Sequence, residues 1–552
     1  MKRVKVIGLV LIGALLALAP ASYGQRKGEK TAAAAAAPAP AHGAADYISA
    51  QQLKDYLAFI ASDEMEGRDT PSRGLDTAAR FIATHLSRWG LKPAGDDGSY
   101  FQRIALTQNK IDPALTYVEI NGQRFNFGND FLAGLTAGVA SGPLVYVGHG
   151  WVIKAKSIDA FQGLDVKDKI VVINFGGPPK GVNFNELKGK QGEDWEQPLN
   201  AAHKRGAKGA IFLPNFSTLA NWERNRQNFV ERGFVSVDKF QTQNNVAFPA
   251  ITASPKLLNA LFQGEKYNAG EVFNRSAAND PVEPFEFKAD KKVSFTVALK
   301  TAPAATQNVV AVLEGSDPVL KNEYVAIGAH YDHVGVGTPV NGDAIYNGAD
   351  DDGSGTVATL AMAEAFANGP RPKRSILFIW HAGEEKGLWG SRYFTENPTV
   401  PIGQIITELN IDMIGRTRKE NDKPANQPLP KPGEIYLIGS KMMSTELGEL
   451  SESVNKSYLN LAFNYKYDDP KDPEQFFYRS DHYNYARKGI PIIFYMDGVH
   501  EDYHRPSDSV EKIDYQNMEK VTRAIYATAW ELANRATRPR VDKPLPAEGS
   551  GS

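Results

Sequence analysis

The second half of the chain alternates continuous apolar runs with helical patterns. The apolar runs occupy residues 309–313, 324–329, 376–380, 405–411 and 490–495. Runs without polar positions are typical of strands that are buried on both faces of a sheet. Helical stretches such as 356–367 lie between them. The pattern therefore predicts an α/β fold whose central sheet is flanked by helices.

The first half of the chain has two kinds of pattern. Residues 53–60 and 78–89 show apolar side chains at helical spacing, as in amphipathic helices. From about residue 115 the pattern changes to short β-rich runs and changes back near residue 295. We therefore predict one α/β domain, built from residues 46–114 and 296–537, with a β-rich domain of residues 115–295 inserted into it.

The N-terminus has the features of an export signal. It begins with three basic residues, Lys2, Arg3 and Lys5. The apolar run 6–18 is short for a membrane span, and we expect cleavage after a signal peptide of residues 1–24, with Ala21 as the second cleavage candidate. An exported protein, periplasmic or secreted, is the expectation, and an uncleaved anchor is the alternative. The composition of residues 25–45 predicts a disordered linker, and that of residues 538–552 predicts a disordered tail.

Composition narrows the range of partners. The 552 residues are 42% hydrophobic and 23% charged, with a net charge of -2. This balance is typical of a globular protein and gives no reason to expect binding to nucleic acid or stable insertion into a membrane. The chain has no cysteine. Disulfides, thiolate metal ligands and a lipidated cysteine are therefore excluded.

Five short segments carry the side chains that can perform chemistry, and most of them follow an apolar run. They are residues 330–332, 348–355, 384–388, 410–412 and 503–504. Open α/β sheets place their ligand sites at the carboxyl ends of strands, so we expect these segments to meet. Together they supply two imidazoles, three carboxylates suited to metal binding and one further glutamate. This is the inventory for a pair of zinc ions and a general base.

The spacing within the segments suits this chemistry. Asp332 stands two residues after His330, so its carboxylate can accept the second ring N–H of a metal-bound imidazole. The three adjacent carboxylates at 350–352 repel one another unless a cation neutralises them. An acidic turn in water or a calcium loop is the alternative there. At Glu384 and Glu385, one side chain can bind metal while the other takes a proton from water.

These motifs resemble metallopeptidase family 28, the zinc exopeptidases that include bacterial leucyl aminopeptidases and glutamate carboxypeptidase II. The resemblance extends to residues 62–68 and 502–508. Residues 163–171 and 205–210 resemble the protease-associated domain, which implies that the insert is such a domain. The implied fold is the zinc exopeptidase fold, of the phosphorylase/hydrolase-like type, with a mixed central sheet flanked by helices.

The resemblance also implies a metal centre. One zinc would be bound by His330 and Asp412, the other by Glu385 and His504, and Asp351 would bridge them. A cis peptide bond is expected after Asp351. The expected cofactors are two Zn²⁺ ions, and such a site would also accept Co²⁺ or Mn²⁺.

Three further residues match catalytic positions of the family. Glu384 matches the general base, Asp332 the residue that orients the first histidine, and Tyr503 a position that hydrogen-bonds the tetrahedral oxyanion in some members. The remaining histidines near the motifs are interpreted as packing residues or as supports behind the ligands; they are His333, His381, His482 and His500.

The implied activity is that of an exported zinc aminopeptidase. It would hydrolyse the N-terminal residues of peptide substrates through a metal-bridging hydroxide, with Glu384 as general base. Asp481 is a candidate to hold the substrate amine, and four aromatic residues could line an apolar pocket: Trp389, Phe476, Phe477 and Tyr478.

Three alternatives remain open. Arg479 could pair with a substrate carboxylate, which would indicate a dipeptidase or carboxypeptidase like glutamate carboxypeptidase. A glutaminyl-cyclase-like acyltransferase would use a similar fold with a single zinc. A binding protein without activity is the third alternative, although all five ligand positions are filled. The oligomeric state cannot be inferred from the sequence.

Overall fold

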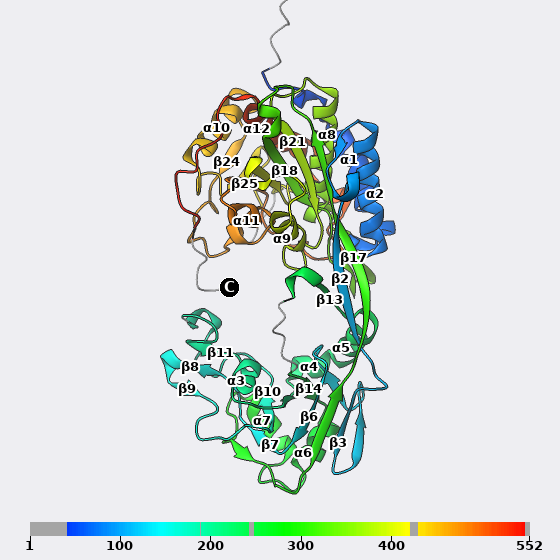
Figure 1. Ribbon diagram of the computed structural model, residues 1–552, viewed down its shortest axis with the longest axis vertical. Coiled ribbons are helices and arrows are strands. Elements are labelled where there is room, and N and C mark those ends of the chain that lie inside the picture. The colour runs from blue at the N-terminus through cyan, green and yellow to red at the C-terminus, as the bar shows by residue number, and fades with distance from the viewer. Residues whose placement is uncertain (1–40, 188, 242–247, 420–428, 547–552) are drawn as a thin grey trace, which may run out of the picture. The chain divides into compact units, whose positions relative to one another are not determined.

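The main sheet of the protein is mixed, as the sequence predicts. The computed structural model describes residues 41–187, 189–241, 248–419 and 429–546. The ten strands of this sheet are β1 (Lys92–Pro93), β2 (Phe101–Ile111), β13 (Phe234–Val237), β17 (Leu299–Leu313), β18 (Tyr324–His330), β21 (Ser375–His381), β22 (Ile405–Ile411), β23 (Glu434–Ile438), β24 (Ala462–Asn464) and β25 (Ile492–Met496). They follow the order β13-β2-β17-β21-β18-β22-β25-β23-β24, and β1 pairs with β17 (Figure 1). The four strands β21, β18, β22 and β25 are parallel, whereas β17 and β23 run antiparallel to β21 and β25.

The apolar runs form strands because both faces of the sheet are covered. In β21, Ile376, Phe378 and Trp380 belong to one hydrophobic cluster. Leu377 and Ile379 between them belong to another. Successive side chains of a strand point to opposite faces, so a run with no polar position is what two covered faces require.

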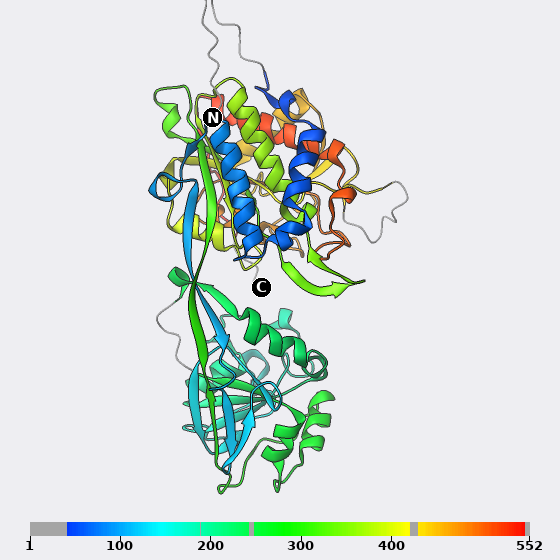
Figure 2. The same ribbon diagram turned by 90° about the vertical axis from the view of Figure 1, so that its right-hand side faces the viewer.

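Helices supply both covers. One face is covered by α1 (Ala50–Ile60), α2 (Arg73–Arg88), α8 (Gly355–Asn368), α10 (Thr445–Ser457) and α12 (Tyr515–Asn534). Figure 2 shows α1 and α2, in blue, beside α8, in green. The other face is covered by α9 (Trp389–Glu396) and α11 (His482–Ala486). The predicted flanking helices are therefore confirmed.

The inserted segment forms sheets of its own. A six-stranded sheet has the order β15-β7-β10-β12-β14-β5 and a four-stranded sheet the order β4-β3-β16-β6. Their strands are β3 (Tyr117–Ile120), β4 (Gln123–Asn126), β5 (Phe131–Ala133), β6 (Gly138–Gly142), β7 (Leu144–Tyr146), β10 (Ile170–Asn174), β12 (Gly209–Leu213), β14 (Ala250–Ala253), β15 (Phe285–Glu286) and β16 (Val293–Val297). A three-stranded sheet adds β8 (Val152–Ile153), β9 (Ile158–Asp159) and β11 (Trp195–Glu196). The hydrophobic clusters beneath these sheets draw on residues 111–297.

Helices also pack within this segment, and one strand leaves it. The helices are α3 (Pro198–Lys204), α4 (Phe216–Ala220), α5 (Trp222–Gln227), α6 (Pro255–Phe262) and α7 (Ala269–Ala277). The strand β13 pairs with β2 and so joins the main sheet. The proposed boundaries at 115 and 295, and the identity of the insert as a protease-associated domain, stay predictions.

Both ends of the chain differ in part from the predicted disorder, since Ala44 and Ala45 of the predicted linker are buried in the main hydrophobic cluster. The predicted signal peptide and residues 25–40 of the predicted linker lie outside the described residues. At the C-terminal end, Arg538 donates a hydrogen bond to Glu323 (2.9 Å), and the Asp542 N–H donates to the Met443 carbonyl (3.0 Å). Disorder from residue 538 is therefore wrong for this stretch, because these residues have partners on the main domain.

No helix among the described residues has both the length and the apolar character needed to cross a bilayer.

Candidate metal centre and active site

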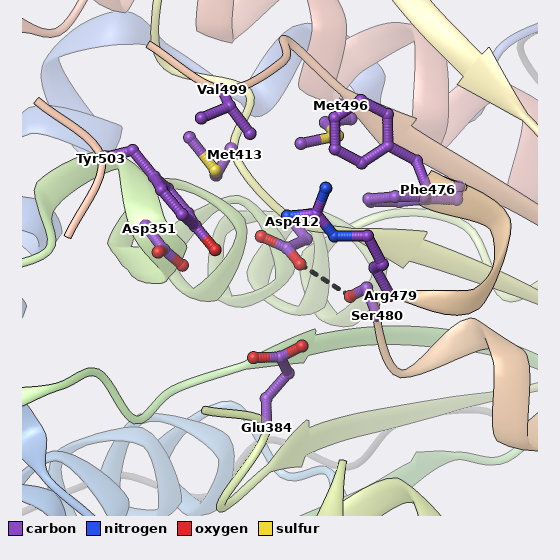
Figure 3. Close-up of a pocket in the computed structure, with 11 residues that line it drawn as sticks. Asp351, Glu384, Asp412, Met413, Phe476, Arg479, Ser480, Met496, Val499 and Tyr503 are labelled. Atoms are coloured by element: carbon purple, nitrogen blue, oxygen red, sulfur yellow. Dashed lines mark hydrogen bonds between the residues drawn. The ribbon is translucent and has the colours of Figure 1, made fainter. Parts of the chain in front are cut away.

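The predicted site residues meet at the carboxyl ends of the central strands. They come from the end of β18, the loops after β21, β22 and β25, and the turn before α8: His330, Asp332, Asp351, Glu384, Glu385, Asp412, Tyr503 and His504. Figure 3 shows Asp351, Glu384, Asp412 and Tyr503 around one cavity. The parallel strands place these loops side by side, which is why segments distant in sequence converge.

Two groups of potential ligand atoms share Asp351. In the first group, His330 Nε2 lies 3.3 Å from Asp351 Oδ1 and 3.5 Å from Asp412 Oδ1. In the second group, His504 Nε2 lies 3.1 Å from both Asp351 Oδ2 and Glu385 Oε2. Within each group the ligand atoms all lie within 4.8 Å of one another. Each oxygen of the Asp351 carboxylate therefore faces a different group.

A further histidine belongs to the second group. His333 Nδ1 lies 2.9 Å from Glu385 Oε1 and 3.6 Å from Asp351 Oδ2. The sequence interpretation treats His333 as a packing or supporting residue. A single histidine in a loop has no periodic signal, so the pattern alone does not distinguish it.

The atoms of both groups suit metal ions. Five of them lack a hydrogen-bond partner among the described residues: His330 Nε2, His333 Nδ1, Asp351 Oδ2, Glu385 Oε1 and His504 Nε2. Buried polar atoms normally have a partner, and adjacent carboxylates repel one another. A cation would remove both costs, and imidazole nitrogen with carboxylate oxygen is a zinc donor set. The residues present therefore fit divalent metal ions.

Without metal, protons balance part of the negative charge. Burial alone would lower the pKa of His330, but Asp412 and Glu384 outweigh it and hold this pKa well above its ordinary value. Burial would also lower the pKa of His504, which the neighbouring carboxylates raise to about 10. Burial raises the pKa of the Glu384 carboxyl well above its ordinary range. The site is thus built for more positive charge than the side chains supply.

Asp332 lies beside His330, but its carboxylate makes other contacts than expected. His330 Nδ1 lies 3.1 Å from the Asp332 carbonyl oxygen and 3.7 Å from carboxylate Oδ1. The carboxylate accepts hydrogen bonds from the Glu384 N–H (3.2 Å) and the Thr70 hydroxyl (3.1 Å). Asp332 therefore connects the strand end of His330 to the segment that carries Glu384.

Only one of the three adjacent aspartates faces the ligand atoms. The Asp508 carboxylate accepts hydrogen bonds from the N–H groups of Asp350 (3.0 Å) and Asp351 (3.1 Å). Asp352 Oδ1 accepts one from the Met413 N–H (3.1 Å). The peptide bond between Asp351 and Asp352 is cis, as the resemblance implies. The turn is therefore held by the carboxylates of Asp508 and Asp352, while Asp351 projects into the site.

Arg68 holds the loops behind the site. Its side chain is fully buried. The guanidinium donates hydrogen bonds to four backbone carbonyls: Ile60 (2.7 Å), Tyr331 (2.9 Å), Asn347 (2.7 Å) and Gly348 (2.9 Å). The carbonyls of Tyr331 and Gly348 belong to the two segments that carry His330 and Asp351. The motif at 62–68, which carries no chemistry itself, thus has a structural explanation.

A cavity opens beside the two groups (Figure 3). Its polar lining is Asp351, Glu384, Asp412, Arg479, Ser480 and Tyr503, and its apolar lining is Met413, Phe476, Phe494, Met496 and Val499. The Ser480 hydroxyl donates to Asp412 Oδ2 (2.7 Å). The Tyr503 ring stacks on His504 with centroids 3.9 Å apart. One end of the cavity is therefore charged and the other apolar.

The structure corrects two expectations about this cavity. Asp481 is fully buried and does not line this cavity, so its position does not support a contact with a substrate amine. Of the four predicted aromatic residues, Phe476 lines this cavity and Trp389 lines a different one, whereas Phe477 and Tyr478 are not part of its lining. Met413, Met496 and Val499 were not predicted, because single apolar residues after strands resemble ordinary core positions.

Arg479 lines the apolar part of the cavity. Its guanidinium carbon lies 4.7 Å from the centre of the Phe476 ring. The Glu474 carboxylate, 4.0 Å away, is its one ion-pair partner among the described residues. Arg479 therefore presents positive charge to anything that enters the cavity.

Comparisons with known proteins agree with this geometry. Residues 308–529 match the sequence model of peptidase family M28. The chain is 26% identical over 225 residues to a probable leucine aminopeptidase of Arthroderma benhamiae, covering 39% of this chain and 56% of that protein. It is 27% identical over 270 residues to a probable zinc metalloprotease of Pyrenophora teres f. teres, covering 43% of this chain and 54% of that protein. The chain thus spans about half the length of these curated relatives.

A solved structure shares the fold. The aminopeptidase from Aneurinibacillus sp. strain AM-1 aligns with a TM-score of 0.52 and 18% identity, over 91% of this chain and 98% of that chain. At this identity the likeness shows the fold alone. All five predicted ligands fall within residues 308–529, the region that matches the sequence model of peptidase family M28.

Proposed function

We propose that this protein is a two-zinc aminopeptidase that removes N-terminal residues from short peptides. The observation that carries the proposal is the position of Asp351, whose two carboxylate oxygens face two separate groups of ligand atoms. His330 and Asp412 would complete one zinc site, and Glu385 and His504 the other. Cobalt or manganese would be accepted in place of zinc. The match of residues 308–529 to the model of a peptidase family supports the peptide bond as the target.

Glu384 would act as the proton carrier. When bound, the ions would polarise the scissile carbonyl and acidify a water molecule. The Glu384 side chain lines the cavity, and its Oε2 lies 4.0 Å from His330 Nε2. A carboxylate at this position can take the proton of the attacking water and pass it to the leaving amine. The hydrogen bond from its own N–H to Asp332 fixes the segment that carries it.

Tyr503 would stabilise the charge that develops on the carbonyl oxygen. Its side chain lines the cavity and stacks on His504. Burial raises the pKa of the Tyr503 hydroxyl well above its ordinary value. The group therefore stays protonated at neutral pH, so that it can donate a hydrogen bond to an oxyanion.

The cavity suits a substrate with a free amine and an apolar side chain. The carboxylates of Glu384 and Asp412 face the cavity, and this negative charge attracts an ammonium group. On the other side, Met413, Phe476 and Met496 form an apolar wall. We therefore propose that the N-terminal residue binds with its amine toward the carboxylates and its side chain against this wall.

One observation favours a second candidate function. Arg479 lines the same cavity and has only a distant ion-pair partner at 4.0 Å. An arginine in this position could bind a substrate carboxylate. The protein would then be a dipeptidase or a carboxypeptidase with the same metal centre.

Cleavage of free and N-acetylated dipeptides separates the two functions. An aminopeptidase that holds the amine by a buried charged contact should lose about 2–5 kcal/mol when the amine is acetylated. This corresponds to a loss of roughly 30-fold or more in kcat/KM. Equal cleavage of both substrates would reject the aminopeptidase function. If Arg479→Gln then abolished cleavage of the acetylated dipeptide, the carboxylate-binding alternative would be established.

Two parts of the chain would serve the enzyme without taking part in its chemistry. We propose that residues 1–24 direct export and are removed, which N-terminal sequencing of the exported protein checks by a start at Gln25. We also propose that the insert 115–295 shapes access to the site. Among the described residues, both groups of potential metal ligands lie outside this segment.

A further inference from the structure

We infer that His333 is a direct ligand of the second metal ion, which makes the two metal sites unequal. The inference rests on the proposed two-metal centre and adds a ligand to it. With His333, the second site has four protein ligands: His333, Asp351, Glu385 and His504. The first site keeps three: His330, Asp351 and Asp412.

The position of the His333 ring supports ligation. The residue is fully buried, and neither ring nitrogen has a hydrogen-bond partner among the described residues. Nδ1 lies 2.9 Å from Glu385 Oε1, yet the pair does not meet hydrogen-bond geometry. A ring nitrogen and a carboxylate oxygen that lie this close without a hydrogen bond between them are placed as two ligands of one metal ion would be.

The surrounding backbone makes room for this ring. Gly348 has φ +56, and a Cβ at this position would lie 2.5 Å from His333 Cγ. The His333 N–H donates to the Arg68 carbonyl oxygen (3.1 Å), which fixes the start of the side chain. The ring also meets His504 edge to face, with centroids 5.5 Å apart. The imidazole is therefore held with Nδ1 toward the second group.

The two sites should differ in function. Four protein ligands fill a tetrahedral zinc site, whereas three leave a position open for water or substrate. The second site should therefore bind its ion more tightly and fill first. The first site should bind more weakly and keep the open position.

The absence of cysteine from the chain permits a direct test. Because Nδ1 is the ring nitrogen nearer to the backbone, a cysteine sulfur at position 333 can reach the same metal. In the cobalt-loaded protein, His333→Cys should show a thiolate-to-cobalt charge-transfer band in the near ultraviolet. His85→Cys, on helix α2, is the matched control and should show none. Two bound cobalt ions in His333→Cys without this band would overturn the inference.

Metal titration supplies a second readout that does not depend on activity. Competition with a chelator should show two unequal zinc affinities in the native protein. Loss of a supporting group behind a ligand already costs 10–100-fold in affinity, so His333→Ala should weaken the tighter site by about 100-fold or more. His85→Ala should leave both affinities unchanged. If His333→Ala kept the zinc affinities of the native protein, the ligand role of His333 would be rejected and the two-metal centre would stand. If the native protein bound fewer than two ions, the proposed function itself would be rejected.

Discussion

The main sheet and the six-stranded sheet of the insert contain similar strands but differ at their ends. Both have parallel strands with buried apolar residues, such as β18 and β21 in one and β10 and β12 in the other. The main-sheet strands lead into His330, Glu384 and Asp412. In the insert, β10 ends at Asn174, and β12 is followed by Pro214 and Asn215.

This difference separates the requirements of fold and chemistry. Apolar side chains on both faces are sufficient for a parallel sheet, whatever follows the strands. A cluster of buried charges adds a cost that must be balanced by counter-charge. In the main sheet that balance is incomplete, since unpartnered ligand atoms face each other around Asp351. The contrast predicts large effects for changes at the main-sheet ends and small ones in the insert.

The largest effect is expected for Glu384→Gln. A neutral amide cannot carry the proton, so turnover should fall by about 10²–10⁴-fold. Because Glu384 is not a proposed ligand, metal content should stay the same, which elemental analysis checks. Glu385→Gln is the matched variant and should instead weaken one metal site. Metal loss in Glu384→Gln, with metal retained in Glu385→Gln, would show that the two roles are exchanged.

Loss of Arg68 should have the next largest effect. Arg68→Met leaves four backbone carbonyls without their buried donor, which should lower the free energy of unfolding by about 3–5 kcal/mol. The comparison is Arg205→Met in the insert, whose ion pairs with Asp159 and Glu196 are partly exposed. That variant should lose about 1 kcal/mol or less. Urea unfolding measures the free energy of unfolding of both variants. Equal losses in the two would contradict the claim that Arg68 supports the loops of the site more than Arg205 supports the insert.

Zinc affinity should rise with pH. In the metal-free protein the pKa of His504 is about 10, above its ordinary value of 6.5. Proton binding to His504 therefore stabilises the metal-free fold fully below about pH 6.5, and this contribution is lost as the pH rises through 10. Zinc binds the neutral ring and must release that proton, so affinity should rise by up to about tenfold per pH unit. Chelator competition from pH 6 to 8 measures this, and a pH-independent affinity would contradict it.

The smallest effect is expected in the insert. Phe234 on β13 lines a cavity with Lys386 and Trp389, which follow Glu385 closely in the chain. Phe234→Ala should change KM for longer peptides and leave kcat within about threefold, since no proposed chemical group is altered. The control is Phe216→Ala, on α4, because Phe216 is also an exposed phenylalanine of the insert (66% exposed, against 52% for Phe234). A large loss of kcat, with metal content and folding intact, would show that the insert contributes to the chemistry.

The sequence predicts the parts of this structure that repeat a pattern. The strands β18 and β21 follow from unbroken apolar runs, and β22 follows from a run that Thr407, Glu408 and Asn410 interrupt. The ligands at the ends of these strands follow from charged residues in unusual places. The first half of β17 does not follow from such a pattern, because residues 300–305 are mostly exposed and look like a loop. His333 and Asp481 are polar residues that follow no periodic pattern, and both are fully buried. Only the packing around them decides that His333 lies among the potential ligand atoms and that Asp481 does not line the cavity.

The metal content of the native protein tests the central claim most directly. After extensive dialysis, the protein should retain two zinc ions per chain. When metal-free protein is titrated with zinc, peptide hydrolysis should return only as the second equivalent is added, because both groups around Asp351 must be filled. Full activity with one zinc or fewer per chain would contradict the two-metal centre and favour a single-zinc, cyclase-like enzyme.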